Sequence, residues 1–292
     1  MKIGEIFRDR ARVFSAEVFP PKRDGNLEAL YRAIEELKAL DPSYISVTYG
    51  AGGSTRDMTY EIALKLIRTG VTPLVHLTCV GHSRDELREL LDKLRDTGVE
   101  NILALRGDPP RGETVFTPAS DGFRYASELV SFIRKEGYSF SLGVAGYPSK
   151  HPEAPSLAAD LDRLKAKVEA GAEFIVTQLF FDNAEYFRLV EGLHQRGVHV
   201  PVQPGIWLIT DVRQIERICS LSGVQFPKDL HAKLERARDD KNAMGEIGVE
   251  FAARQCAELL HNGAPGIHFY AMNKSAPALR VRADLAVMGL AH

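Results

Sequence analysis

Glu17 is the side chain whose type and surroundings most directly suggest catalysis. It lies in the segment SAEVFPP, between Ala16 and Val18 and close to Phe19, so its carboxyl group is expected in apolar surroundings. Loss of hydration raises the pKa of a carboxyl group, and a raised pKa would make Glu17 a general acid near neutral pH. The alternative is a structural carboxylate paired with a basic neighbour inside the fold. The sequence leaves both interpretations open.

Polar side chains also follow most of the other apolar segments. Asp108 in ALRGDPP could be a second functional carboxylate, or it could accept hydrogen bonds in a turn with Arg106 as its partner. His76 in LVHLTC is more simply read as an interior histidine, since no spacing of His, Cys, Asp and Glu resembles a metal site. The loop 50–55, GAGGST, could offer its amides to a phosphate. The other polar residues at segment ends are Thr48, Tyr147, His151, Gln178, Gln203, His268 and Lys274.

Eight short segments rich in apolar and β-branched residues predict strands. Most of them contain few polar residues, which is typical of parallel strands covered on both faces. Helical patterns lie between them, for example over 26–40 and over 83–97, where Ser83 and Glu86 form a capping-box pattern. The predicted strands are 13–19, 44–49, 73–80, 101–105, 139–145, 173–178, 200–203 and 266–270.

This alternation of strands and helices predicts an α/β fold, a (β/α)8 TIM barrel, formed as one domain over 1–292. The long interval before the last strand leaves room for an extra helical segment, and 242–260 has a helical pattern. A doubly wound sheet is the alternative, but no G-x-G-x-x-G follows the first strand. In a barrel, catalytic residues gather at the C-terminal ends of the strands, which is where the polar residues lie.

The composition argues against several classes of protein. There are 37 Lys and Arg against 39 Asp and Glu, so the chain lacks the basic excess of a nucleic-acid-binding protein. The N-terminus has no signal-peptide pattern, and no apolar stretch is long enough to span a membrane. The three cysteines are far apart and never form a CxxC, which favours reduced thiols. We therefore expect a cytoplasmic protein without nucleic-acid or membrane partners.

Taken in order, the segments described above resemble the methylenetetrahydrofolate reductase family. The resemblance covers almost the whole chain, and its most specific motifs are LALRGDPP, HPEA and TQLFFDN. The matching segments are FSAEVFPP, SVTYGAGGST, HLTC, LALRGDPP, YPSKHPEA, DLDRLKAKVEAGA, TQLFFDN, PGI and HFYAMNK.

The resemblance implies a flavoprotein that reduces 5,10-methylenetetrahydrofolate to 5-methyltetrahydrofolate, a step of one-carbon metabolism and methionine supply. FAD would bind at the C-terminal end of the barrel, NADH or NADPH would reduce it and leave, and the folate would then accept the hydride in a ping-pong cycle. Glu17 would protonate the folate, and Asp108 would place a negative charge near the flavin that stabilises the cationic iminium.

The resemblance also implies a set of binding residues, among which Arg106 and Lys167 would pair with the FAD diphosphate. The residues expected to line FAD are Thr48, Tyr49, Ala51, His76, Arg106, Gly107, Asp108, Tyr125, Ala126, Tyr147, His151, Asp160 and Lys167. The residues expected to contact the folate are Glu17, Asp108, Gln178, Gln214 and Lys274, the last of them at the glutamate tail.

Several positions depart from the family pattern. Lys274 stands where an arginine is expected, which keeps the charge but loses bidentate pairing with a carboxylate. Arg163 and Ala166 stand where asparagine and arginine are expected, so the basic partners of the diphosphate are rearranged. Trp207 in PGIWLITD is also unusual, and its pattern fits either contact with a ligand ring or simple packing.

The chain is most similar to the bacterial type of the family, which favours NADH as the electron donor. It ends shortly after the last predicted helix, so we expect the catalytic barrel alone, without a regulatory domain. The main alternative is a flavin-binding barrel subunit that a partner protein reduces. A folate-binding barrel without redox activity and a flavin barrel acting on another amine are further alternatives. Association into a homo-oligomer is expected.

Overall fold

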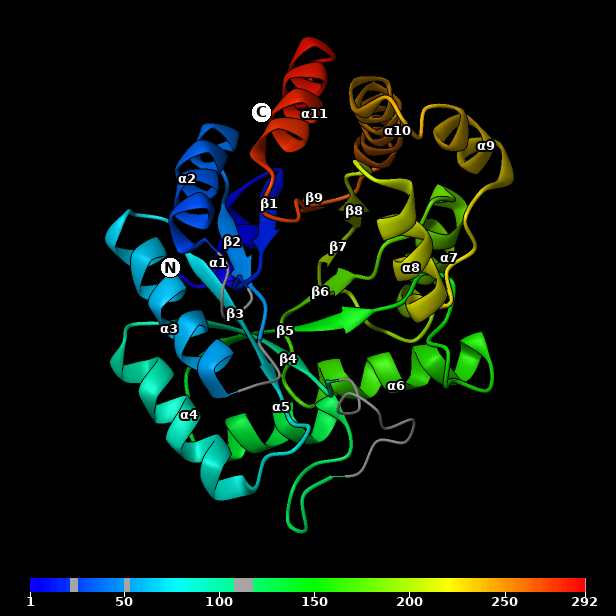
Figure 1. Ribbon diagram of the computed structural model, residues 1–292. Coiled ribbons are helices and arrows are strands. Elements are labelled where there is room, and N and C mark those ends of the chain that lie inside the picture. Colours follow the sequence, from blue (N-terminus) through cyan, green and yellow to red (C-terminus); the bar gives the residue numbers. More distant parts are fainter. Residues whose placement is uncertain (22–25, 50–52, 108–117, 292) are drawn as a thin grey trace.

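Parallel strands form the centre of the molecule. The computed structural model describes residues 1–21, 26–49, 53–107 and 118–291. Within these residues nine strands form one sheet, in the order β7-β6-β5-β4-β3-β2-β1-β9-β8, and every described pairing is parallel. Figure 1 shows the strands curved into a ring with the helices around the outside. The predicted barrel is therefore confirmed.

The helices and strands have the following bounds. The strands are β1 Val13–Val18, β2 Tyr44–Val47, β3 Pro73–Thr78, β4 Asn101–Leu105, β5 Ser141–Gly146, β6 Phe174–Thr177, β7 Val202–Gln203, β8 Gly205–Trp207 and β9 Gly266–Tyr270. The helices are α1 Ile3–Asp9, α2 Leu27–Leu37, α3 Gly53–Arg68, α4 Arg84–Asp96, α5 Ala126–Lys135, α6 Leu157–Glu169, α7 Asn183–His194, α8 Val212–Ser222, α9 Lys228–Arg236, α10 Lys241–His261 and α11 Ser275–Val287, with a short 3-10 turn at Lys38–Leu40.

The seventh predicted strand, 200–203, differs from the expectation, because only its end forms a strand, β7, and a further strand, β8, follows beyond Gln203. Strand β7 pairs with β6, whereas β8 pairs with β9. Pro204 lies between the two strands, and proline has no N–H to continue a ladder of hydrogen bonds. The Pro204 carbonyl still accepts a hydrogen bond from His268 N at 2.9 Å. The chain through Pro204 therefore connects the two end strands of the sheet, β7 and β8, and the described residues form nine strands in place of the expected eight.

The helices confirm two predictions and add two elements. Helix α4 begins with the expected capping box of Ser83 and Glu86. The extra helical segment expected over 242–260 is confirmed as α10, and α9 is an added helix that precedes it. Helix α1 was not predicted. Ile3 and Ile6 of this helix are buried, and the amide of Ile3 donates to Asn101 Oδ1 at the first residue of β4. Helix α1 therefore covers the N-terminal end of the barrel.

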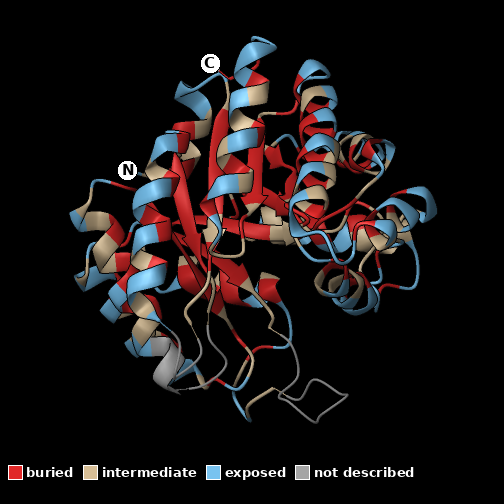
Figure 2. Cartoon of the chain, turned by 45° about the horizontal axis from the view of Figure 1, so that its top comes forward, coloured by how far each residue is buried: buried red, intermediate tan, exposed pale blue. Residues whose placement is uncertain are grey.

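The two faces of the strands carry different residues. The outward residues of β1, Phe14, Ala16 and Val18, pack in the large apolar core under the helices. The inward residues change along the strand, from Val13 in a small apolar cluster with α1 to Ser15 and Glu17 nearer the C-terminal end. Figure 2 shows the buried strands enclosed by helices whose outer faces are exposed. The polar inner face was hidden by the largely apolar composition of the strands.

The helices also bear on the expected location of the protein. Among the described residues, none of the helices combines the length and the apolar composition needed to cross a membrane.

Candidate functional site

Glu17 lies near the C-terminal end of β1 and faces three polar side chains from other strands. Its Oε2 atom accepts a hydrogen bond from Ser46 Oγ of β2 at 3.3 Å. The same atom lies 3.3 Å from His76 Nε2 of β3 and 3.7 Å from His268 Nε2 of β9. The Glu17 side chain is 16% exposed, whereas the side chain of His268 is 1% exposed. The carboxylate is thus held from behind by buried groups and stays accessible on one side.

A second layer of polar groups lies behind this carboxylate. Ser15 Oγ is 2.7 Å from His268 Nδ1, and both residues are fully buried. The ring of Tyr44 stacks on His268 with the ring centres 5.9 Å apart, and its hydroxyl donates to Gln203 Oε1. Gln203 Nε2 in turn donates to the Val13 carbonyl at 2.7 Å. These bonds fix the orientation of the His268 ring from below.

The pKa of Glu17 does not follow the sequence-based expectation. Burial raises it, as expected, but hydrogen bonding by His268 and Ser46 and the positive charges that His76 and His268 carry when protonated outweigh burial and lower the pKa overall. Burial itself lowers the pKa of His76. The expectation of a raised pKa was wrong because the polar partners come from strands that the sequence alone could not place beside Glu17.

The cationic residues at the ends of β4 and along α6 form a second group. Arg106 makes a bidentate ion pair with Glu153, with N–O distances of 2.6 and 2.7 Å. Lys167 Nζ donates to the Ala145 carbonyl at 2.9 Å. Burial above all, together with the charges of Arg106 and Arg163 and against the opposing charge of Asp160, lowers the pKa of Lys167 to about 8. Lys167 is therefore a partly buried amine that like charges crowd, not a member of a surface ion pair.

The loop after β5 connects this group to the barrel. Asp160 in the first turn of α6 accepts a hydrogen bond from His151 N at 2.8 Å. The rings of Tyr147 and His151 meet edge to face with centres 4.7 Å apart. Burial lowers the pKa of His151, which Glu153 only partly opposes. The structure thus brings together four of the residues predicted to bind FAD: Tyr147, His151, Asp160 and Lys167.

Gly107, directly after β4, has a clear conformational reason to be glycine. Its φ is +89°, which favours glycine, and a Cβ atom there would lie 2.4 Å from Val80 Cγ1. The chain can turn after Arg106 only because this position carries no side chain.

The other residues predicted to bind FAD lie at the same end of the barrel. Thr48 follows β2, and Tyr49 Oη is 3.1 Å from His82 Nε2. Tyr125 is half exposed at the start of α5, and Ala126 is the buried first residue of that helix. The predictions for Ala51 and Asp108 fall outside the described residues.

The residues predicted to contact folate are less tightly grouped. Gln178, which follows β6, folds its side chain back so that Leu179 N donates to its Oε1 at 2.9 Å. Gln214 lies in the first turn of α8, and Lys274 Nζ donates to Thr210 Oγ1 at 2.8 Å. Trp207 at the end of β8 packs against Tyr270, with ring centres 5.9 Å apart. Packing is therefore the role of Trp207 that the structure shows.

Sequence reasoning did not single out four residues of this site: Ser15, Ser46, Glu153 and Tyr270. Ser15 and Ser46 lie in quoted motifs, and the period of two along a strand could have placed Ser15 on the same face as Glu17. Nothing in the sequence indicates that Tyr270 meets His268 edge to face, with ring centres 5.3 Å apart.

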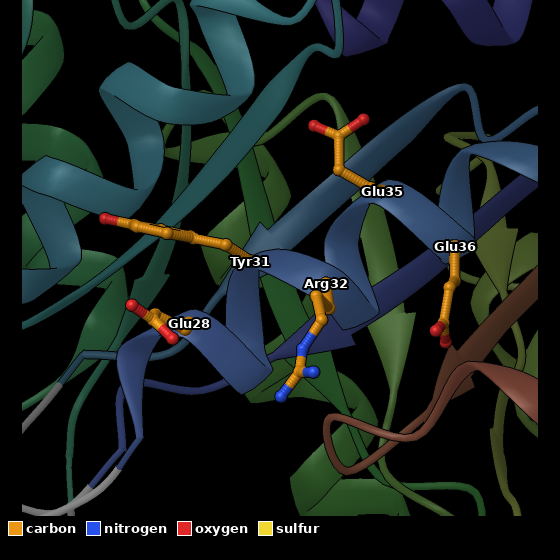
Figure 3. A pocket seen from close by; sticks show the side chains of 5 residues that line it. All are labelled: Glu28, Tyr31, Arg32, Glu35 and Glu36. Carbon is orange, nitrogen blue, oxygen red and sulfur yellow. The ribbon is translucent and has the colours of Figure 1, made fainter.

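Two other groups of charged side chains lie on the outer helices. One lines a depression on a single helix, α2, and Figure 3 shows that its charged ends do not converge on one point; it consists of Glu28, Tyr31, Arg32, Glu35 and Glu36. The other joins α8 and α9, where Glu216, His231 and Glu235 lie within 4.8 Å of one another. The hydrogen bond between His231 Nε2 and Glu216 Oε1, at 2.6 Å, accounts for that arrangement.

Comparison with known proteins finds a matching family model and similar sequences from plants and bacteria. Residues 2–285 match the family model described as methylenetetrahydrofolate reductase. The chain is 36% identical to "Methylenetetrahydrofolate reductase (NADH) 1" of Arabidopsis thaliana, covering 98% of this chain and 50% of that protein. It is 35% identical to "5,10-methylenetetrahydrofolate reductase" of Pectobacterium carotovorum subsp. carotovorum, covering 93% of this chain and 91% of that protein. The chain thus spans about half the length of the plant relative and most of the bacterial one.

Two further comparisons concern the electron donor and the fold. The chain is 34% identical to "Probable methylenetetrahydrofolate reductase (NADPH)" of Caenorhabditis elegans, covering 99% of this chain and 44% of that protein. A solved structure of an uncharacterized protein from Clostridium thermocellum, which binds two copies of 5-methyl-5,6,7,8-tetrahydrofolic acid, superposes with a TM-score of 0.66 at 14% identity, covering 98% of this chain and 100% of that one. At that identity the likeness concerns the fold alone.

Proposed function

Because the chain belongs to the methylenetetrahydrofolate reductase family, we propose that it reduces 5,10-methylenetetrahydrofolate to 5-methyltetrahydrofolate with FAD as cofactor and NADH as electron donor. The observation that carries this proposal is the placement of Glu17, which is partly accessible and is held by Ser46, His76 and His268 at the C-terminal end of the barrel. Catalytic residues of barrel enzymes lie at this end.

The cationic group near β4 and α6 fits the diphosphate of FAD. Arg106, Arg163 and Lys167 act on one another strongly enough that their like charges help to lower the pKa of Lys167 to about 8. A diphosphate would relieve this repulsion and would favour the charged form of the lysine. Arg106 would exchange its carboxylate partner, Glu153, for a phosphate oxygen. The rearranged basic residues of α6 therefore still suit an anionic cofactor.

When bound, FAD supplies the transfer of hydride from the nicotinamide to the folate. The residues of the protein supply the proton and orient the folate. Glu17 would donate its proton to the folate nitrogen that leaves the methylene carbon as the five-membered ring opens. The Gln178 amide would turn from its own backbone towards the pterin, and the Lys274 ammonium would attract the carboxylates of the glutamate tail. Asp108 would stabilise the iminium cation that the proton transfer creates.

An anaerobic visible spectrum of the purified protein tests this function. The flavin band should bleach with NADH and return when 5,10-methylenetetrahydrofolate is added. A band that stays with NADH and NADPH but bleaches with dithionite would favour a subunit that a partner protein reduces. A preparation that binds folate yet takes up no flavin would contradict the proposal.

The donor is tested in the same cuvette. The proposal predicts faster bleaching by NADH than by NADPH at equal concentrations, and the reverse order would correct it. The predicted homo-oligomer, which sedimentation can measure, does not affect this assignment.

A further inference from the structure

A row of four hydrogen-bonding side chains runs from the barrel interior to the Glu17 carboxylate. Ser15 Oγ lies 2.7 Å from His268 Nδ1, His268 Nε2 lies 3.4 Å from Ser46 Oγ, and Ser46 Oγ lies 3.3 Å from Glu17 Oε2. From this geometry we propose that His268 holds a reserve proton for Glu17 and that the Ser46 hydroxyl passes it on. The inference rests on the proposed function, in which Glu17 acts as the acid.

Glu17 needs such a reserve because of its own surroundings. Hydrogen bonds and nearby positive charge lower its pKa overall, so without substrate it is a carboxylate at neutral pH. An acid must carry a proton when the substrate nitrogen requires one. His268 is 1% exposed, so a proton on its ring is shielded from direct exchange with solvent. The contacts through Ser46 lead from that ring to Glu17, whose side chain is 16% exposed.

The transfer balances as a shift of one positive charge along the row. In the charged imidazole, Nδ1–H donates to Ser15 Oγ and Nε2–H donates to Ser46 Oγ, whose own hydroxyl donates to Glu17 Oε2. The bond from Nε2 to its hydrogen breaks as a new O–H bond forms at Ser46, and the old Ser46 O–H bond breaks as Glu17 gains the proton. His268 is left neutral and Glu17 is left as a carboxylic acid. Ser15 keeps the Nδ1 proton in place throughout.

The other titratable groups that face His268 among the described residues do not compete for this role. They are Tyr44 of β2, Tyr270 of its own strand, His76 of β3 and Glu17 itself. Burial raises the pKa of both tyrosines well above the ordinary value, so both stay neutral. Burial lowers the pKa of His76, which leaves that ring neutral above its ordinary titration range. His268 is therefore the member of the cluster that we assign as the proton store.

The test compares His268→Gln and Ser46→Ala with the original protein in two measurements. The first is the pH profile of the folate half-reaction of the flavin-loaded enzyme. The second is a carbon-13 NMR titration of the Glu17 carboxyl group in the unliganded protein. Ser141→Ala is the matched control, because it removes a fully buried hydroxyl from β5 at the opposite end of the barrel.

The two measurements should move in opposite directions in His268→Gln. The Glu17 pKa should rise, because the imidazole beside the carboxylate, which favours its charged form, is gone. The descending limb of the folate half-reaction should move to lower pH, because Glu17 would then have to supply the proton without a store behind it. Ser46→Ala should slow the same half-reaction. Both variants should keep the rate of flavin reduction, and Ser141→Ala should match the original protein in every measurement.

Three results would overturn the inference. One is a limb that stays in place in His268→Gln, and another is an equal shift in His76→Gln, which would assign the effect to the other ring. The third is an unchanged Glu17 pKa in unliganded His268→Gln. That last result needs neither flavin nor folate, so it separates failure of the inference from failure of the proposed function. If Ser46→Ala alone has no effect on the rate, the proton does not pass through Ser46.

Discussion

Replacing Lys167 by methionine is predicted to stabilise the protein without its cofactor. Each pKa unit by which the folded chain differs from the unfolded chain corresponds to about 1.4 kcal/mol. A fall from 10.5 to about 8 therefore penalises the charged lysine by about 3 kcal/mol at pH 7. Lys167 is only partly buried and its Nζ bonds to the Ala145 carbonyl, so we expect a net gain of about 1–3 kcal/mol for Lys167→Met.

The stability gain of Lys167→Met should decrease as the pH rises. Because the pKa is lower in the folded chain, the penalty is fully present below pH 8 and disappears as the pH rises towards the ordinary value of 10.5. Urea unfolding of the flavin-free protein should thus show a gain for Lys167→Met at pH 7 that falls by about half at pH 9.5. FAD affinity should fall at the same time, since the ammonium would pair with the diphosphate.

Lys165→Met is the matched control for this experiment. Lys165 lies on the same helix with its side chain 39% exposed, and it approaches Glu169 at 3.6 Å. Its replacement should change stability and FAD affinity little at either pH. A loss of stability in Lys167→Met, or a gain that does not change with pH, would refute the reasoning.

Three further predictions concern the site itself. Glu17→Gln should slow the folate half-reaction by about 10²- to 10⁴-fold and leave flavin reduction near normal in stopped-flow measurements, and an equal loss in both would remove Glu17 from the acid role. Gly107→Ala should destabilise the protein by about 1–3 kcal/mol because of the positive φ at this position, and by more because the new Cβ would contact Val80. Gly137→Ala is the control, since φ there is +81° but the new Cβ meets no atom within 4 Å, and thermal melts should show a smaller loss of stability for it. Asp108→Asn should stay yellow and raise the flavin potential, and an unchanged potential would count against a position near the flavin.

The parts of the fold that could be predicted are those that depend on neighbouring residues. The capping box at Ser83 requires only a hydroxyl and a Glu three residues later, and both are visible in the sequence. The end of β7 before Pro204 could have been read from the same kind of local rule. Helix α1 escaped prediction because it is short and its stability depends on packing against the barrel.

The electrostatics of the site could not be predicted in this way. Ser15 and His268 are 253 residues apart, and only the parallel register of β1 and β9 brings them together. The apolar neighbours of Glu17 in sequence point outward, into the core beneath the helices. The groups that decide its pKa lie on β2, β3 and β9 instead. A sequence shows which residues precede and follow a carboxyl group, but not which ones face it across a barrel.

Helix α1 also determines from which end of the barrel substrates can approach Glu17. It packs Ile3 and Ile6 into the N-terminal end of the barrel, where its amides bond to Asn101 and Ser141. Because α1 covers that end, we expect both proposed substrates to reach the Glu17 carboxylate from the opposite end of the barrel. Each would then obstruct the other, so an excess of folate should inhibit consumption of NADH, and an excess of NADH should inhibit uptake of folate.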